Sequence, residues 1–164
     1  MGYNVVRVNK DNYFMFYDMV FYRKHGREKN KNELSMIQDF SSYYTALEIQ
    51  TFYAFAVQFE EKFVGYIFIN FFPKVGTGNG KGWLYVDDLW VNPNFRRKGV
   101  ANTLMEKADA LSKEMGTLGL RLYVNTNNPD GISLYKKCGY EQKFGTALMM
   151  QKEWIEEEDY AETD

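Results

Sequence analysis

Residues 83–101 of the chain are WLYVDDLWVNPNFRRKGVA, and the rest of the sequence is best understood around this stretch. It predicts a buried β-strand, a short turn, a basic cluster and a glycine at the start of a helix. Backbone N–H groups at a helix N-terminus attract anions, so we expect this stretch to hold an anionic ligand. The same stretch brings two carboxylates, Asp87 and Asp88, close to that place.

The composition indicates one folded domain with an acidic tail. The chain has 164 residues, of which 45% are hydrophobic and 18% aromatic, which is enough for a sizeable core. Residues 153–164 contain seven acids and no base, so the rest of the chain has a net charge of about +5. We therefore expect a single domain over residues 1–152 and a solvated acidic tail over residues 153–164.

The modest positive charge of the domain suits an anionic cofactor. No basic stripe with interleaved aromatic residues occurs, so nucleic acid is not expected as a partner. No apolar run reaches the roughly 18–20 residues that span a bilayer, and residues 1–10 lack the apolar region of a signal peptide. The single cysteine, Cys138, cannot form an internal disulfide, and no metal-ligand cluster is evident. We expect a cytoplasmic protein without a membrane or metal partner.

Hydrophobic periodicity and turn residues predict an α+β fold. Helices are expected over residues 12–22, from a cap at Asn32 to about Leu47, over 100–115 and over 130–138. The apolar face of the first helix is expected to contain Phe14, Met15, Met19 and Tyr22. Strands are expected over residues 3–8, 51–59, 63–72, 83–91, 118–124, 140–144 and 147–152.

The order of these elements predicts a mixed, largely antiparallel and twisted sheet of about seven strands, flanked by about four helices. A tight turn at residues 60–62 joins the strands at 51–59 and 63–72 into a hairpin. A crossover through the helix at 100–115 makes the strands at 83–91 and 118–124 parallel neighbours.

Three local patterns occur in order along the chain. Residues 86–96, VDDLWVNPNFR, match LEDLxV-x-P-x-x-R, and residues 96–101, RRKGVA, match Q/R-x-x-G-x-G/A. Residues 128–140, NPDGISLYKKCGY, match N-x-x-(A/G)-x-x-(L/F)-Y-x-K-x-G-(F/Y). With these patterns at the expected separation, the chain resembles the GNAT superfamily of acetyl-CoA-dependent N-acetyltransferases. Within it, the chain is most similar to diamine and polyamine acetyltransferases.

The resemblance implies the GNAT fold, in which one parallel strand pair is splayed at the cofactor site, and acetyl-CoA as the acetyl donor. Residues 96–101 would hold the pyrophosphate, and a bulge at residues 89–91 would expose backbone groups to the acyl carbonyl and the pantetheine arm. Asn128 would cap a helix, contact coenzyme A, or both. The implied cofactor-binding residues are Leu89, Trp90, Val91, Arg96, Arg97, Lys98, Gly99, Val100, Ala101, Asn128 and Tyr135.

The resemblance also implies two catalytic side chains. An alkyl amine has a pKa near 10.4, so reaching its nucleophilic form at pH 7 costs about 4.6 kcal/mol. Asp87 occupies the position where polyamine-type relatives carry a glutamate proposed as the base, and a carboxylate there can take the proton through water. Tyr135 matches the general acid of the family, whose hydroxyl donates a proton to the leaving thiolate.

Strand alternation separates the two neighbouring carboxylates. It would put Asp87 on one face of its strand with Tyr85 and Leu89. Asp88 would lie on the other face, with Leu84, Val86 and Trp90. We therefore expect Asp87 to face the amine and Asp88 to have a structural role.

The sequence favours an N-acetyltransferase that acts on a small-molecule amine. Several aromatic residues are candidates to enclose a cation by their ring faces. They lie in the two N-terminal helices and just before the loop at 73–82, and they are Tyr17, Tyr22, Tyr43, Tyr44, Phe71 and Phe72. Two alternatives stay open, a protein N-terminus or lysine as the acceptor, and an acetyl-CoA-binding module without turnover. A dinucleotide-binding fold is excluded, since G-x-G-x-x-G and the βαβ repeat are missing. The sequence leaves a homodimer open, because two-fold dimers are common among similar proteins.

Overall fold

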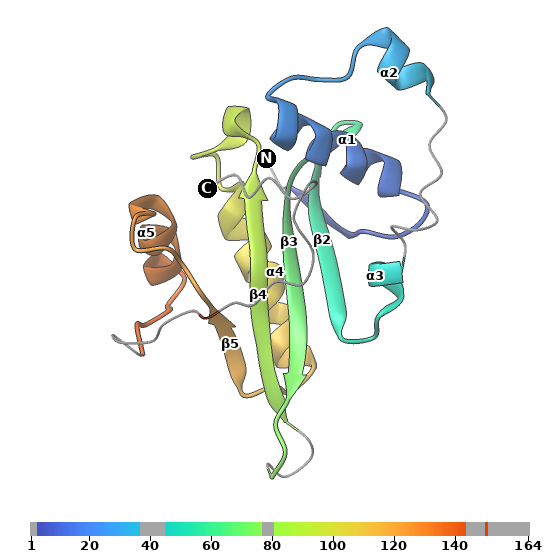
Figure 1. The fold of residues 1–164 in the computed structure, drawn as a ribbon. Helices are drawn as coiled ribbons and strands as arrows, with labels where there is room; N and C mark the ends of the chain where they lie inside the picture. Colours follow the sequence, from blue (N-terminus) through green and yellow to red (C-terminus); the bar gives the residue numbers. More distant parts are fainter. Residues whose placement is uncertain (1–2, 37–44, 77–80, 144–149, 151–164) are drawn as a thin grey trace.

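The computed structural model describes residues 3–36, 45–76, 81–143 and 150 (Figure 1). In this part of the chain, five strands form one sheet in the order β1-β2-β3-β4-β5. The strands are β1 Asn4–Arg7, β2 Phe52–Phe59, β3 Lys62–Pro73, β4 Gly82–Val91 and β5 Gly119–Leu122. Neighbours from β1 to β4 are antiparallel, whereas β4 and β5 are parallel, which confirms the predicted crossover.

The described helices flank this sheet. They are α1 Tyr13–His25, α2 Lys31–Ser35, α3 Thr45–Glu48, α4 Val100–Glu114 and α5 Pro129–Lys137, with a short 3₁₀ turn at Pro93–Phe95. Helix α1 packs on one face of the sheet, and α4 packs on the other (Figure 1). Together with the mixed sheet, they confirm the predicted α+β class.

The two faces of the sheet bury different side chains. On the α4 face, Ile67, Leu84 and Leu104 have no exposed area and belong to one large apolar cluster. On the α1 face, Phe16 and Tyr66 belong to a second, more aromatic cluster. The α4 face therefore forms the main aliphatic core, and the α1 face is the one on which polar side chains come close to buried rings.

The buried face of α1 differs from the prediction. Its buried residues are Tyr13, Phe16 and Met19, whereas the side chain of Phe14 is 55% exposed. The spacing of three residues is helical, as expected, but the stripe begins one residue earlier. Helix α4, within the range predicted for a helix at 100–115, buries one regular apolar stripe that contains Val100, Leu104, Ala108 and Leu111.

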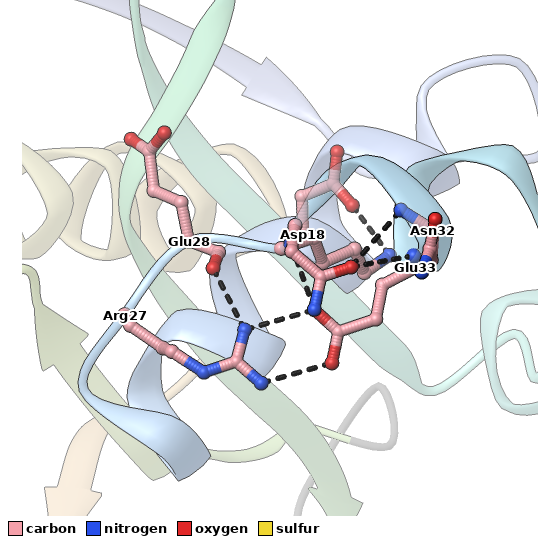
Figure 2. A network of polar contacts seen from close by, with 7 residues as sticks. Asp18, Arg27, Glu28, Asn32 and Glu33 are labelled. Carbon is pink, nitrogen blue, oxygen red and sulfur yellow. Dashed lines mark hydrogen bonds and ion pairs between the residues drawn. The ribbon is translucent and has the colours of Figure 1, made fainter.

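Polar contacts fix the segment between α1 and α2 (Figure 2). The guanidinium of Arg27 donates two hydrogen bonds, of 2.8 and 2.9 Å, to the carboxylate of Glu33, and Figure 2 shows these groups facing each other. These bonds are the main reason that the pKa of Glu33 is lowered to about 2. Asn30 caps α2 by accepting from the N–H groups of Asn32 and Glu33, so the predicted cap at Asn32 is wrong by two residues.

Two other expectations change within the described residues. Helix α2 ends at Ser35, because Met36 has an extended backbone, so the predicted helix does not run unbroken to Leu47. Residues 140–143 form no strand, which contradicts the first part of the predicted strand at 140–144. Residue 144, most of the strand predicted at 147–152, and the acidic tail at 153–164 lie outside the described residues. The described sheet therefore has five strands, where about seven were expected.

Candidate active site

Strand β4 loses one of its two partners half-way along its length. It pairs with β5 from Trp83 opposite Gly119 to Val86 opposite Leu122, and the pairing ends there. Residues 89–91 of β4 still pair with β3 on the other side. The parallel strands therefore diverge, and Figure 1 shows the chain after β5 leading away from β4 toward α5. This divergence is the predicted splay.

A β-bulge lies at the point where the strands diverge. Phe68 is opposite Asp88, but the next residue of β3, Ile69, is opposite Val86, so Asp87 is the extra residue on β4. The bulge is two residues before the stretch 89–91 in which it was expected. An extra residue reverses the alternation of side chains along the strand.

The predicted division of the β4 side chains is therefore wrong. Leu84 and Val86 lie on the α4 face, together with Leu89 beyond the bulge. Trp90 packs against the cluster on the α1 face, and Asp88 is hydrogen-bonded to Tyr66, a residue of the same cluster. Simple alternation had grouped Val86 with Asp88, but the extra residue between them puts them on opposite faces.

The loop before α4 is shaped to present N–H groups. Arg97 and Gly99 both have positive φ, of 61° and 88°, and Gly99 is the N-cap of α4. A Cβ at Gly99 would have no heavy atom within 4 Å, so the space beside this N-cap is open. Within the described part of the chain, no hydrogen-bond acceptor is found for the backbone N–H groups of residues 97–102. Free N–H groups at a helix start bind phosphate, so this geometry fits a pyrophosphate.

Helix α5 forms the opposite wall. The Oδ1 atom of Asn128 accepts a 2.9 Å hydrogen bond from the N–H of Gly131, so Asn128 caps this helix. The phenol of Tyr135, about two turns beyond this cap, is half-buried. Burial, followed by the negative charge of Asp88 and by interaction with the Cys138 thiol, raises the pKa of Tyr135. The hydroxyl of Tyr135 therefore stays protonated at neutral pH and is able to donate.

These two walls enclose a cleft of about 780 Å³. It is lined by almost every residue expected to bind the cofactor, namely Leu89, Trp90, Val91, Arg96, Arg97, Gly99, Val100, Ala101, Asn128 and Tyr135. Lys98 and Asp87 do not line it. The ammonium of Lys98 lies 5.3 Å from the centre of the Phe95 ring, and Asp87 is exposed.

Sequence reasoning missed part of the cleft. Further lining residues include Phe95, Asn102, Asn125, Asn127, Asp130 and Lys137. Residues 125–127 were read only as a turn, although the side chains of Asn125 and Asn127 line this polar site next to a helix start. The cleft is also bridged by Arg97, which donates a 2.9 Å hydrogen bond to Asp130 at the start of α5. Both side chains are about four-fifths exposed, so this ion pair is weak and can open for an anion.

The two carboxylates at the bulge have different surroundings. Asp87 is exposed, yet its pKa is raised, first by partial burial of its carboxyl group and second by the charge of Asp88. The Oδ2 atom of Asp88 accepts two hydrogen bonds of 2.6 Å, from Arg23 of α1 and from the hydroxyl of Tyr66 of β3. Asp88 thus takes part in a fixed ionic network, whereas Asp87 is the less constrained of the two.

Comparison with known proteins assigns the chain to a family. Residues 17–140 match the acetyltransferase (GNAT) family, and the chain belongs to it. The chain is 42% identical over 59 residues to the GCN5-related N-acetyltransferase 4 of Arabidopsis thaliana, a match covering 36% of this chain and 20% of the relative. It is 34% identical over 68 residues to a spermidine N(1)-acetyltransferase of Thermoplasma acidophilum, covering 40% of this chain and 42% of the relative.

Solved structures share the whole fold. An aminoglycoside acetyltransferase from an uncultured soil sample, in complex with trehalose, has a TM-score of 0.71 at 18% identity, covering 92% of this chain and 97% of its own. The acetyltransferase AAC(6')-Iy, in complex with a bisubstrate analogue containing coenzyme A, has a TM-score of 0.71 at 12% identity, covering 93% and 99%. At these identities the likeness concerns the fold alone. The matches to the curated sequence relatives span between one fifth and about two fifths of their length.

Within the described ranges, no helix is long and apolar enough to cross a membrane. The same residues contain no group of three or more His, Cys, Asp or Glu side chains that could hold a metal ion.

Proposed function

We propose that this protein transfers an acetyl group from acetyl-CoA to a primary amine of a small molecule, by direct attack within a ternary complex in the cytoplasm. The observation that carries the proposal is the cleft beside the splayed end of β4. In it, the free N–H groups at the start of α4 and the half-buried phenol of Tyr135 share one space of about 780 Å³.

The walls of the cleft suit the parts of coenzyme A. The N–H groups of residues 97–102, with the guanidinium groups of Arg96 and Arg97, would hold the pyrophosphate. Backbone groups of residues 89–91, which β5 does not pair, would hold the pantetheine arm and donate to the acyl oxygen. When bound, acetyl-CoA supplies an activated thioester carbonyl. Lys98 does not line the cleft, so its part in the proposal is limited to adding positive charge at the helix start.

Two side chains would accept and donate the protons of the reaction. As the amine nitrogen bonds to the carbonyl carbon and the carbon–sulfur bond breaks, the amine loses a proton and the sulfur gains one. Asp87 would accept the first through water, because its raised pKa makes it a stronger base than an ordinary aspartate. Tyr135 would donate the second, because its hydroxyl stays protonated at neutral pH.

The acceptor class is supported by relatives whose names concern small amines. These include the spermidine acetyltransferase above and a thialysine N-epsilon-acetyltransferase of Caenorhabditis elegans, 36% identical over 58 residues. A protein acceptor is the second candidate. The same fold is found in a ribosomal-protein-alanine N-acetyltransferase of Brucella melitensis, with a TM-score of 0.68 at 16% identity, so the fold is compatible with a protein acceptor.

Release of free thiol from acetyl-CoA tests the proposal. It should be followed against polyamines, aminoglycosides, amino acids and peptides with a free N-terminus or lysine. We expect release that depends on a small primary amine and rises with pH as the amine deprotonates. Release with peptides alone would favour the protein acceptor. Cofactor binding without release for any acceptor would favour a binding module and contradict the proposal.

A further inference from the structure

Side chains from α1 and β3 hold the carboxylate of Asp88 on β4. Both hydrogen bonds that this carboxylate accepts from the described side chains end on Oδ2, one from Nη1 of Arg23 and one from the hydroxyl of Tyr66. Arg23 and Tyr66 are also in direct contact with each other. Within the described part of the chain, the second oxygen, Oδ1, has no hydrogen-bond donor. The Asp88 side chain is 32% exposed, so a ligand can reach this carboxylate while Oδ2 is held in place.

Aromatic side chains lie near this carboxylate. Phe68 is directly opposite Asp88 on the neighbouring strand, and Tyr66 is opposite Trp90. The rings of Tyr66 and Phe68 are 4.8 Å apart, and those of Tyr66 and Trp90 are 6.2 Å apart. A carboxylate near aromatic rings can stabilise an ammonium group, through the ion pair and through cation–π contacts where the ammonium lies over a ring.

The same carboxylate lies beside the cofactor cleft. Trp90, two residues further along β4 on the same face, lines the cleft. The charge of Asp88 also contributes to the raised pKa of Tyr135 on the opposite wall. An amine held at Asp88 would therefore be next to the space in which the acetyl group would lie.

We propose that Oδ1 of Asp88 binds the ammonium group of the acceptor, and that Arg23 and Tyr66 are positioning residues that hold Oδ2. This inference rests on the proposed function and names the binding residue of the acceptor. It leaves Asp87 as the group that takes the proton, and it replaces the structural role expected for Asp88.

The charges at the bulge support a single ammonium as the ligand. Asp87 and Asp88 are two negative charges, and Arg23 is one positive charge, so the group is left with one net negative charge. One ammonium neutralises it. A neutral alcohol of the same shape leaves the charge unpaired, and an added carboxylate near the amine is repelled, so the site favours alkyl amines over α-amino acids.

Equilibrium binding tests the inference separately from turnover. Isothermal titration calorimetry should measure the affinity of the full chain for butylamine and 1,4-diaminobutane in the presence of coenzyme A. Butan-1-ol is the neutral comparison. We expect both amines to bind and the alcohol not to bind. Asp88→Asn should weaken amine binding about tenfold or more, because it removes a charge-assisted hydrogen bond. Coenzyme A affinity should stay unchanged.

Two further variants separate binding from folding. Asp11→Asn removes the same charge from an exposed aspartate before α1 and should leave amine affinity unchanged. Tyr66→Phe keeps the ring but removes the hydroxyl that donates to Oδ2, and Arg23→Lys keeps the charge. Both should raise KM for the amine several-fold without changing KM for acetyl-CoA, and Arg23→Lys should be milder than Arg23→Met.

The outcomes distinguish the inference from the proposed function. If the wild type acetylates amines and Asp88→Asn leaves their KM unchanged, the inference fails and the function stands. If amines bind in an Asp88-dependent way without thiol release, the function fails and the inference stands. If no amine binds to the wild type in the presence of coenzyme A, the inference is overturned.

Discussion

The two halves of β4 belong to one strand but have different tasks. The first half, up to Val86, pairs with β3 on one side and β5 on the other, and its Leu84 has no exposed area. The second half begins at the bulge, pairs with β3 alone, and brings Asp88 and Trp90 to the candidate site. A single extra residue, Asp87, separates the two halves. We expect the first half to determine the stability of the fold and the second half to take part in substrate binding and acetyl transfer. Variants in each half can test this division.

The largest effect is expected from Tyr135, which faces the second half of β4 across the cleft. Tyr135→Phe should lower kcat by about 10²–10⁴-fold, the usual contribution of a general acid. KM for acetyl-CoA should change little, because the ring keeps its packing. Tyr123→Phe, on a side chain that is 76% exposed and outside the cleft, is the matched control and should have wild-type kcat. An unchanged kcat in Tyr135→Phe would remove this residue as the acid.

The next effect concerns stability in the first half of β4. Leu84→Ala removes a fully buried side chain from the α4 face, so the free energy of unfolding should fall by about 2–5 kcal/mol. Denaturant unfolding measures the loss, and the folded fraction should keep its KM for both substrates. Leu118→Ala, at a side chain that is 42% exposed, should cost much less. A large change of KM at low temperature in Leu84→Ala would show that the two halves are not separate.

A smaller effect is expected from the glycine at the start of α4. Gly99 has a φ of 88°, so Gly99→Ala strains the backbone by about 1–2 kcal/mol and puts a methyl group where the pyrophosphate is expected. We expect acetyl-CoA affinity to fall about tenfold. Gly26→Ala changes the helix-capping glycine of α1, whose φ is 66° and whose surroundings are also open, and should cost similar stability. If both variants weaken cofactor binding equally, the effect is one of folding and not of the site.

The smallest effect concerns the extra residue itself. The raised pKa of Asp87 means that the folded state disfavours its ionised form. Its contribution to stability is therefore fully present below the ordinary pKa of an aspartate and is lost as pH rises through the raised value. Asp87→Asn cannot ionise, so its Tm should exceed that of the wild type at pH 7, and the two should converge near pH 3. A lower Tm at pH 7 would contradict this direction. The rate gain with rising pH should also be flatter in Asp87→Asn.

Sequence reasoning succeeded where a local pattern has a single structural meaning. Three features each specify a short-range geometry: the cationic run with its glycine at 96–101, Asn128 before Pro129, and the crossover helix. The structure brings these elements together. The apolar stripe of α4 was predictable for the same reason, because its buried residues repeat at helical spacing.

Sequence reasoning failed where pairing with a distant strand decides the outcome. Nothing in VDDLWV shows that Asp87 is bulged, since the bulge exists only through the register between β4 and β3. The contact of Asp88 with Arg23 joins residues 65 positions apart, so no local pattern could indicate it. Among the aromatic candidates for the acceptor site, Phe71 packs on the opposite, α4 face, and Tyr43 and Tyr44 lie outside the described residues.

The contrast between the two halves of β4 is tested most directly by mapping acetyl-CoA onto the backbone with ¹H–¹⁵N chemical shifts. Large shifts are expected for amides of residues 89–91 and 97–102, together with Gly131 and Tyr135 of α5. Amides of residues 83–86, which β3 and β5 already pair, should keep their shifts. Shifts concentrated in residues 83–86, or on α1 and α2 with residues 97–102 unmoved, would contradict the central claim that the splayed half of β4 and the start of α4 form the cofactor site.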